Sequence, residues 1–515
     1  MTAPQATAPI RAGAPAPGAV AAVARGGWWG MAGSAANAVF SFLLVGLVTR
    51  AVGADGSGVV FTGVALFTIL SNTCKLGADA GLIRFVPRDL ALHDGSSVGV
   101  LLRMAVLPAA AASIVAAAPL LLSPTVATLL LPQLPQADAV ALVRLFGLFL
   151  PVATVGMVLL GATRAYGTVV PFVGVEQVGK PLLRLLIALP VACYLPSLPA
   201  LASAWLLPAL AGSAAAWFAL RRCRAGRGAR YSRSAGGGAV SWRTFWSFAA
   251  PRAVSSVFDI SAAWVGVILL SALATAGDAG VYTAIGRIVT AGTLLQLAVR
   301  LAVAPEISRL LALGEDTEAH SLHRVSTCWI VLFSWPLFVL VAAFPETFLA
   351  AFGPEFVQGA PALVVLCAAS MVNVAVGNAQ TVLLMAGRSS WHLAITAVAF
   401  TVQLTVGALA VPVWGVLGAA VSWGAAIVVE NLAAALLIRL RLGFTTVDRG
   451  YTTAVAVGLT VSVVLGAART REGDTPSGLA VGMALGMCVF AISLWRYRTS
   501  LRVSELVGVL RRRAA

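Results

Sequence analysis

Long apolar segments separated by short polar connections run through almost the whole chain. Each segment is about as long as a helix that crosses a roughly 30 Å hydrocarbon layer, which takes about 20 residues. The pattern therefore predicts an all-α polytopic membrane protein with about fourteen transmembrane helices. The apolar segments are residues 27–49, 57–83, 97–122, 138–162, 168–194, 198–220, 244–271, 279–303, 325–347, 360–386, 390–412, 414–438, 450–468 and 477–496.

Composition agrees with a membrane protein. The 515 residues are 59% hydrophobic and only 10% charged, with a mean hydropathy of +0.93, which is too apolar for an ordinary soluble protein. The formal net charge of +16 could indicate a nucleic-acid partner. An arginine excess spread over the loops of a membrane protein instead sets orientation and contacts anionic lipid. We therefore expect membrane lipids as partners and no nucleic acid.

Basic residues concentrate in alternate connections between the apolar segments. Loops rich in Lys and Arg are retained in the cytoplasm, whereas the intervening connections are nearly bare, with Arg469 and Arg471 as the main exceptions. This alternation predicts that both termini are cytoplasmic.

Changes in composition divide the chain into six parts. An Ala/Pro-rich start and an Arg/Gly/Ser-rich stretch near the middle both lack sustained apolar runs. We predict a disordered cytoplasmic tail (1–26), an N-lobe of six helices (27–220), a basic cytoplasmic linker (221–243), a C-lobe of six helices (244–440), two further helices (441–497) and a basic cytoplasmic tail (498–515).

A weak repeat relates the two lobes at a spacing of about 220 residues. The sequence GADGSGVVF at 53–61 resembles TAGDAGVYT at 275–283. Six is an even number of crossings, so the two lobes have the same orientation. Parallel repeats of this kind place the substrate site in a central cavity between the halves.

Ionisable residues lie inside several apolar segments, where charge is costly and by default marks a substrate or ion path. Pairing of Lys75 with Asp79, Glu176 with Lys180, and Arg252 with Asp259 would neutralise part of this charge. Arg184 and Arg287 lack an obvious partner within their own helices. The positive surplus indicates an anionic ligand, because guanidinium groups match phosphate oxygens. The charged residues in question are Lys75, Asp79, Arg84, Glu176, Lys180, Arg184, Arg252, Asp259 and Arg287.

The sequence resembles the polysaccharide exporters and O-antigen flippases of the multidrug/oligosaccharidyl-lipid/polysaccharide superfamily, and more distantly the lipid II flippase. The matching residues run from Arg50 to Phe61 and continue in LGADAGLIRF (76–85), GDAGVYTAIGRI (277–288) and AVAPEISRLLALGED (302–316). The resemblance covers roughly residues 27–440. It implies alternating access that carries a polyprenyl-pyrophosphate-linked oligosaccharide from the inner to the outer leaflet of a bacterial cell membrane.

The resemblance also implies which residues contact the substrate. It favours the first, second, seventh and eighth helices as the cavity wall, and on these helices Lys75, Arg84, Arg252 and Arg287, with Lys180 and Arg184 as further candidates. Asp79, Asp259 and Glu176 are candidates for ion coupling or ion pairing. The last two helices resemble a pair that forms a groove for the lipid tail. Polysaccharide polymerases and glycosyltransferases are expected partners.

Enzyme chemistry is not indicated. The run GVEQVGKP (174–181) matches most of a phosphate-loop pattern, but Pro181 stands where Ser or Thr should hold magnesium. His320 and His323 are expected to be solvated rather than metal ligands. No cofactor or metal is expected. Two alternatives to a flippase stay open: a drug or cation antiporter of the same superfamily, and a non-transporting membrane scaffold for envelope-polymer assembly.

Overall fold

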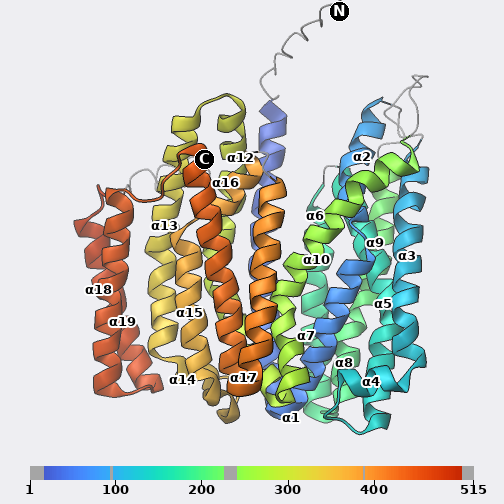
Figure 1. Ribbon diagram of the computed structural model, residues 1–515, viewed down its shortest axis with the longest axis horizontal. Helices are drawn as coiled ribbons and strands as arrows, with labels where there is room; N and C mark the ends of the chain where they lie inside the picture. The colour runs from blue at the N-terminus through green and yellow to red at the C-terminus, as the bar shows by residue number, and fades with distance from the viewer. Residues whose placement is uncertain (1–16, 93–96, 167, 226–239, 387–388, 502–515) are drawn as a thin grey trace, which may run out of the picture.

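The computed structural model describes residues 17–92, 97–166, 168–225, 240–386 and 389–501, and this part of the chain is helical with no β-strand (Figure 1). Helices satisfy every backbone polar group within one segment, which hydrocarbon demands. Ten helical stretches in the described part are long and apolar enough to cross a membrane, or eleven with the bent pair Ala276–Gly292 and Leu294–Arg300. The prediction of an all-α polytopic membrane protein is confirmed, and the count of fourteen crossings stays a prediction.

The helices of the first half of the chain come first. In order these are α1 (Pro17–Cys74), α2 (Ala78–Leu92), α3 (Val98–Leu122), α4 (Pro124–Leu130), α5 (Gln136–Ala165), α6 (Val170–Phe172), the π-helical segment η1 (Val173–Gly179), α7 (Lys180–Tyr194), α8 (Leu198–Leu206) and α9 (Pro208–Ala225).

The helices of the second half follow, and the last two of them lie at one edge of the molecule (Figure 1). In order, the second half consists of α10 (Trp242–Leu273), α11 (Ala276–Gly292), α12 (Leu294–Ala312), α13 (Asp316–Ala343), α14 (Pro345–Ala350), the 3-10 segment η2 (Pro354–Gly359), α15 (Ala360–Ala375), α16 (Ala379–Met385), α17 (Ser389–Leu442), α18 (Arg449–Glu472) and α19 (Pro476–Arg496).

Two of these helices are each much longer than one crossing and reverse at a glycine. Gly53 in α1 has φ 68° and Gly415 in α17 has φ 50°, a backbone conformation that costs glycine little. Figure 1 shows both reversals on the side of the molecule opposite the start of α1. We call the side where α1 starts the terminal face and the opposite side the far face.

The apolar segment predicted as one helix over 57–83 is interrupted. Helix α1 ends at Cys74, residues 75–77 form a turn, and α2 begins at Ala78. Leu76 and Gly77 both have positive φ, and a Cβ on Gly77 would collide with the carbonyl oxygen of Ala249 in α10. Gly77 therefore lies in close contact with α10 at this break, which hydropathy alone does not indicate.

Three of the predicted parts fall largely outside the described residues. These are residues 1–16 of the N-terminal tail, 226–239 of the linker and 502–515 of the C-terminal tail. Helix α1 begins at Pro17, within the segment predicted to be a disordered tail. The lobe boundaries stay predictions.

The two copies of the repeated motif pack against each other. A Cβ on Gly58 would collide with the carbonyl oxygen of Ala276, and a Cβ on Gly280 would collide with that of Ala54. Around this crossing of α1 and α11, Val45 and Ile285 belong to one buried apolar cluster that includes residues of both halves. The halves therefore meet along the 53–61 and 275–283 segments.

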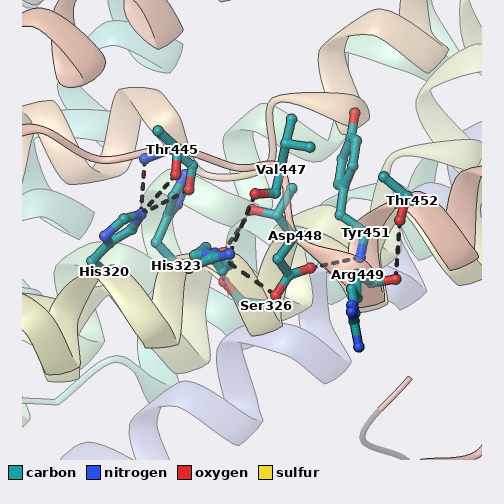
Figure 2. A network of polar contacts seen from close by, with 11 residues as sticks. His320, His323, Ser326, Thr445, Val447, Asp448, Arg449, Tyr451 and Thr452 are labelled. Carbon is teal, nitrogen blue, oxygen red and sulfur yellow. Dashed lines mark hydrogen bonds and ion pairs between the residues drawn. The ribbon is translucent and has the colours of Figure 1, made fainter. Parts of the chain in front are cut away.

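The last two helices are tied to α13 through the segment between α17 and α18 (Figure 2). The Nε2 atom of His320 accepts a hydrogen bond from the backbone N–H of Thr445 at 2.8 Å. Asp448 caps α18 by accepting from the N–H of Tyr451 at 2.7 Å, and its other oxygen lies 3.7 Å from Nε of Arg324. His323, on the same helix, is fully buried. The expectation of two solvated histidines is wrong, because the connecting segment folds back over this face of α13.

Candidate functional site

A cavity of about 220 Å³ lies between the N-lobe helices and the first two helices of the C-lobe. Helix α1 contributes most of its uncharged polar lining, including Asn37, Ser41 and Asn72. Four ionisable side chains complete the lining: Glu176, Lys180, Arg184 and Arg287. Three of them come from η1 and α7, and Arg287 comes from α11, so both halves of the chain contribute charge.

Glu176 and Lys180 form an ion pair within this cavity. Their Oε2 and Nζ atoms are 2.6 Å apart, and the Lys180 side chain is only 5% exposed. Glu176 lies within the π-helical segment η1 and Lys180 follows directly after it, and single π turns within α-helices are frequent at functional sites. Lys180 packs directly on Gly212, where a Cβ would collide with the lysine side chain. This pair is neutral in sum and adds no net charge to the cavity.

Arg184 is held on a tryptophan of the neighbouring helix α8. Its Nε donates to the carbonyl oxygen of Trp205 at 3.1 Å, and its Cζ lies 3.9 Å from the centroid of the indole ring. Arg287 has a similar neighbour, since its Cζ lies 5.3 Å from the ring of Trp264. Aromatic faces attract a cation without neutralising its charge.

The cavity carries a surplus of positive charge. Within the described part of the chain, no carboxylate oxygen lies within 4.0 Å of a side-chain nitrogen of Arg184 or Arg287. Three cations and one carboxylate line the cavity, which leaves a formal charge of +2. A low-dielectric wall strengthens the field of such charges, so the cavity favours an anion.

Lys75 and Asp79 lie elsewhere, in a cluster of their own. The Nζ of Lys75 is 3.1 Å from Oδ2 of Asp79, and a guanidinium nitrogen of Arg164 is 3.6 Å from the same oxygen. A Cβ on Gly161 would lie 2.5 Å from Cβ of Asp79, so α5 approaches closely here. The pairing considered for Lys75 is therefore present, and Arg164 is a third member that the sequence analysis did not single out.

Arg84, Arg252 and Asp259 also lie outside the lining of this cavity. Arg84 is exposed, with its Cζ 4.2 Å from the ring centroid of Phe248. Arg252 is exposed, and its guanidinium has no carboxylate oxygen within 4.0 Å among the residues described. Of the four residues expected to form one cation set, only Arg287 lines the cavity, where it is joined by Lys180 and Arg184.

A second cavity, of about 320 Å³, lies within the C-lobe and was missed by the sequence analysis. Its lining is rich in neutral Asn and Gln side chains, whereas the predicted site residues were selected for their charge. The signal was present in the apolar segment 360–386, which contains NVAVGNAQT at 373–381 with three amides in nine residues. No group of three or more His, Cys, Asp or Glu suited to a metal ion occurs among the described residues.

Comparisons with known proteins agree on the family and the fold. A family model described as polysaccharide biosynthesis protein matches residues 23–311. A search of curated proteins gives no match. Among solved structures, the lipid II flippase MurJ in an inward closed conformation is similar with a TM-score of 0.69 and 11% identity, covering 90% of this chain and 98% of that one.

Two further structures are transporters of the MOP superfamily. An inward-facing multidrug resistance MATE family transporter has a TM-score of 0.59 and 13% identity, over 79% of this chain and 94% of that one. A MOP superfamily transporter from Pyrococcus furiosus, for which a reversed polarity of the binding pocket is described, has a TM-score of 0.54 and 15% identity, over 82% and 95%. At these identities the likeness establishes the fold.

Proposed function

Because the chain belongs to the polysaccharide biosynthesis protein family, we propose that it is a flippase for a lipid-linked glycan. In this proposal the substrate is an oligosaccharide or cell-envelope polysaccharide precursor on a polyprenyl pyrophosphate. It passes from the inner to the outer leaflet of a bacterial cell membrane, and both termini of the protein are cytoplasmic. Glycosyltransferases supply such a substrate, and a polymerase consumes it.

The observation that carries the proposal is the placement of Arg184 and Arg287. Both line one cavity, they come from different halves of the chain, and neither has a carboxylate within 4.0 Å among the residues described. Two guanidinium groups offer the donors that bind the oxygens of a pyrophosphate. Movement of the two halves relative to each other would make and break contacts with such a ligand.

The contact between the repeated motifs supports alternating access. The halves touch along 53–61 and 275–283, near the Gly53 reversal on the far face. With cytoplasmic termini, this arrangement is closed toward the outside. Outward movement of negative charge across an inside-negative membrane gains about 2.3 kcal/mol per charge per 100 mV, so a pyrophosphate headgroup is driven outward without ATP.

The charge of the cavity weighs against the antiporter alternative. A site for cationic drugs needs a surplus of acidic groups, whereas Glu176 is the only carboxylate in the lining and is paired with Lys180. A membrane scaffold would not need Arg184 and Arg287 to line a cavity without a carboxylate partner. The flippase proposal accounts for both features.

A vesicle experiment tests the proposal. The full-length protein is reconstituted into liposomes that contain a polyprenyl-pyrophosphate disaccharide, and headgroup exposure is measured with a membrane-impermeant glycosidase. Flippase activity makes the inner pool of headgroups accessible, so cleavage proceeds beyond the roughly half present in the outer leaflet of protein-free vesicles. Cleavage that stops at the same level with and without protein would contradict the proposal and favour a scaffold.

A further inference from the structure

The C-lobe cavity is built where two helices are broken. Helices α11 and α12 meet at a 44° bend at Thr293. Helices α15 and α16 are separated by residues 376–378, with Gly377 at φ 64°, where a Cβ would collide with the side chain of Thr327. Both breaks line the same cavity. Discontinuous helices at membrane depth are tolerated where they line a cavity, and in transporters they form substrate sites.

The lining of this cavity is polar but nearly neutral. Five amide side chains contribute: Gln296, Asn373, Asn378, Gln380 and Asn431. Four hydroxyl side chains and the ring of Trp423 are added to them. Glu430 and Arg300 supply one charge of each sign, so the formal charge is zero, against +2 in the cavity of Arg184 and Arg287.

Two of the amides hold each other in place. Nδ2 of Asn373 donates to Oε1 of Gln296 at 3.1 Å, and Nε2 of Gln296 donates to the carbonyl oxygen of Gly377 at 3.1 Å. These bonds join α12 to the break between α15 and α16. They fix the wall of the cavity. Nε2 of Gln380 also donates to Oδ1 of Asn431 at 3.5 Å, and Nδ2 of Asn431 donates to the carbonyl oxygen of Ile427 at 2.8 Å.

Asn378 is the one amide of this lining whose side chain has no partner among the described residues. It is 3% exposed, it lines the cavity, and neither its Nδ2 nor its Oδ1 has a hydrogen-bond partner. A buried amide without partners costs free energy unless a ligand or water satisfies it. An amide both donates and accepts, which suits hydroxyl groups better than it suits an ion of either sign.

Helix α11 contributes to the lining of both cavities. Arg287 lines the charged cavity, and Thr290 lines the neutral one. Three residues of helix rise about 4.5 Å along the axis. The two linings therefore come within about one helical turn of each other on α11, a spacing that suits one ligand with an anionic part and a hydroxyl-rich part.

We infer that the C-lobe cavity binds the first uncharged sugar units of the substrate while Arg184 and Arg287 bind its pyrophosphate. This inference rests on the proposed function and adds a second subsite to it. The amides and hydroxyls bind sugar hydroxyl or acetamido groups, and Trp423 packs on the apolar face of a sugar ring. The absence of net charge favours neutral sugars over uronic acids.

Binding measurements with three probes test the inference. Farnesyl pyrophosphate carries no sugar, and two matched probes carry glucose or N-acetylglucosamine on the terminal phosphate. Affinities are measured by thermophoresis with the full-length protein in detergent. We expect at least one sugar-bearing probe to bind about tenfold more tightly than farnesyl pyrophosphate, as one or two added hydrogen bonds would give.

Variants separate the two cavities. Asn378→Ala removes the tenfold gain and leaves the affinity for farnesyl pyrophosphate unchanged, whereas Arg287→Ala weakens all three probes. Gln403→Ala removes a buried amide of the same lobe that lines neither cavity, and it changes none of the affinities. Should Asn378→Ala fail to fold, as judged by size-exclusion chromatography, Gln380→Ala replaces it with the same expected loss of the sugar-dependent gain.

The outcomes keep the two proposals apart. Binding of farnesyl pyrophosphate with no gain from either sugar would overturn the sugar subsite and leave the proposed flippase standing. A sugar-dependent gain that survives both amide substitutions would also overturn the subsite. Failure of all three probes to bind the unmodified protein would contradict the proposed function itself.

Discussion

Gly58 and Gly280 lie against each other's backbone where α1 crosses α11. A Cβ on Gly58 would collide with the carbonyl oxygen of Ala276 and would lie 3.0 Å from the backbone nitrogen of Gly280. Each glycine belongs to one copy of the motif repeated at 53–61 and 275–283. The repeat therefore supplies the two small residues that let the halves of the protein touch.

Substitution of Gly58 by alanine is expected to prevent this contact. Overpacking of a tight interface costs about 1–3 kcal/mol, which is enough to shift the balance between closed and open states by about ten- to a hundredfold. The readout is maleimide labelling of Ser57→Cys, a fully buried position, in a background with its native cysteines replaced by serine. Labelling should rise severalfold in the Gly58→Ala variant.

Gly99→Ala is the control for this experiment. It places the same methyl group at a helical glycine with open space around it, so labelling of Ser57→Cys should not change. Equal labelling in both variants would mean that the Gly58 contact does not hold the far face closed.

Loss of either cavity arginine is expected to slow flipping. Hydrogen bonds to charged groups are worth about 1.5–3 kcal/mol, so Arg184→Ala or Arg287→Ala should lower the rate by about ten- to a hundredfold. Lysine at either position should restore part of the rate, because it keeps the charge but lacks the planar fork. The glycosidase assay in vesicles measures both effects.

Arg103→Ala provides the matched control for charge. Arg103 is exposed on α3 and lines neither cavity, so its loss should leave the rate unchanged. An equal decrease in the flipping rate of all three alanine variants would mean that net charge or expression, rather than the cavity, determines the rate.

The Glu176–Lys180 pair is expected to behave as a unit. Glu176→Gln leaves the 5% exposed lysine without its partner, which should lower the free energy of unfolding. We expect a decrease of about 2 kcal/mol, less than for a fully buried pair, because solvent screens the 31% exposed Glu176. Lys180→Met should destabilise less, since the remaining carboxylate can reach water. The double variant Glu176→Gln, Lys180→Met should recover most of the loss of Glu176→Gln, as measured by thermal unfolding in detergent. Strict additivity of the two single changes would contradict the pairing.

Much of the architecture could be predicted because the membrane leaves the chain few choices. An apolar run of spanning length must be a helix, so hydropathy predicts the fold class without knowledge of tertiary contacts. The repeated motif likewise predicted that the two halves are related, and the structure places its copies in contact.

The rotation of each helix could not be predicted in the same way. Lys75 and Arg287 are both cations within apolar segments, and the sequence offered Asp79 as a partner for Lys75 alone. It did not indicate that Lys75 lies at a helix break outside the cavity lining, whereas Arg287 lines the cavity. At the break, Gly77 lies close to the carbonyl of Ala249, and the sequence does not indicate this contact between residues far apart in the chain. The amides of the C-lobe cavity were missed because their role depends on two broken helices meeting.

The hairpin formed by α18 and α19 is joined to α14 of the C-lobe through Asp474, which lies in the connection between the two helices. Its carboxylate accepts from the backbone N–H groups of Glu346 at 2.9 Å and Thr347 at 3.1 Å, and from the hydroxyl of Thr347 at 2.7 Å. Together with the joint at Asp448, this holds both ends of α18 against the lobe. Asp474 therefore acts as an N-cap for α14, although it belongs to the connection between α18 and α19.

We expect that removal of the Asp474 carboxylate loosens the contact between α14 and the α18–α19 hairpin without unfolding the protein. Loss of an N-cap costs about 1–2 kcal/mol, so Asp474→Ala should speed hydrogen exchange at Glu346 and Thr347 by about five- to thirtyfold. Glu472→Ala removes the same charge from an exposed position beside it and should leave exchange unchanged. If both variants exchange at the rate of the unmodified protein, the hydrogen bonds of Asp474 do not hold the pair. If both are faster, the charge of the hairpin matters rather than the cap.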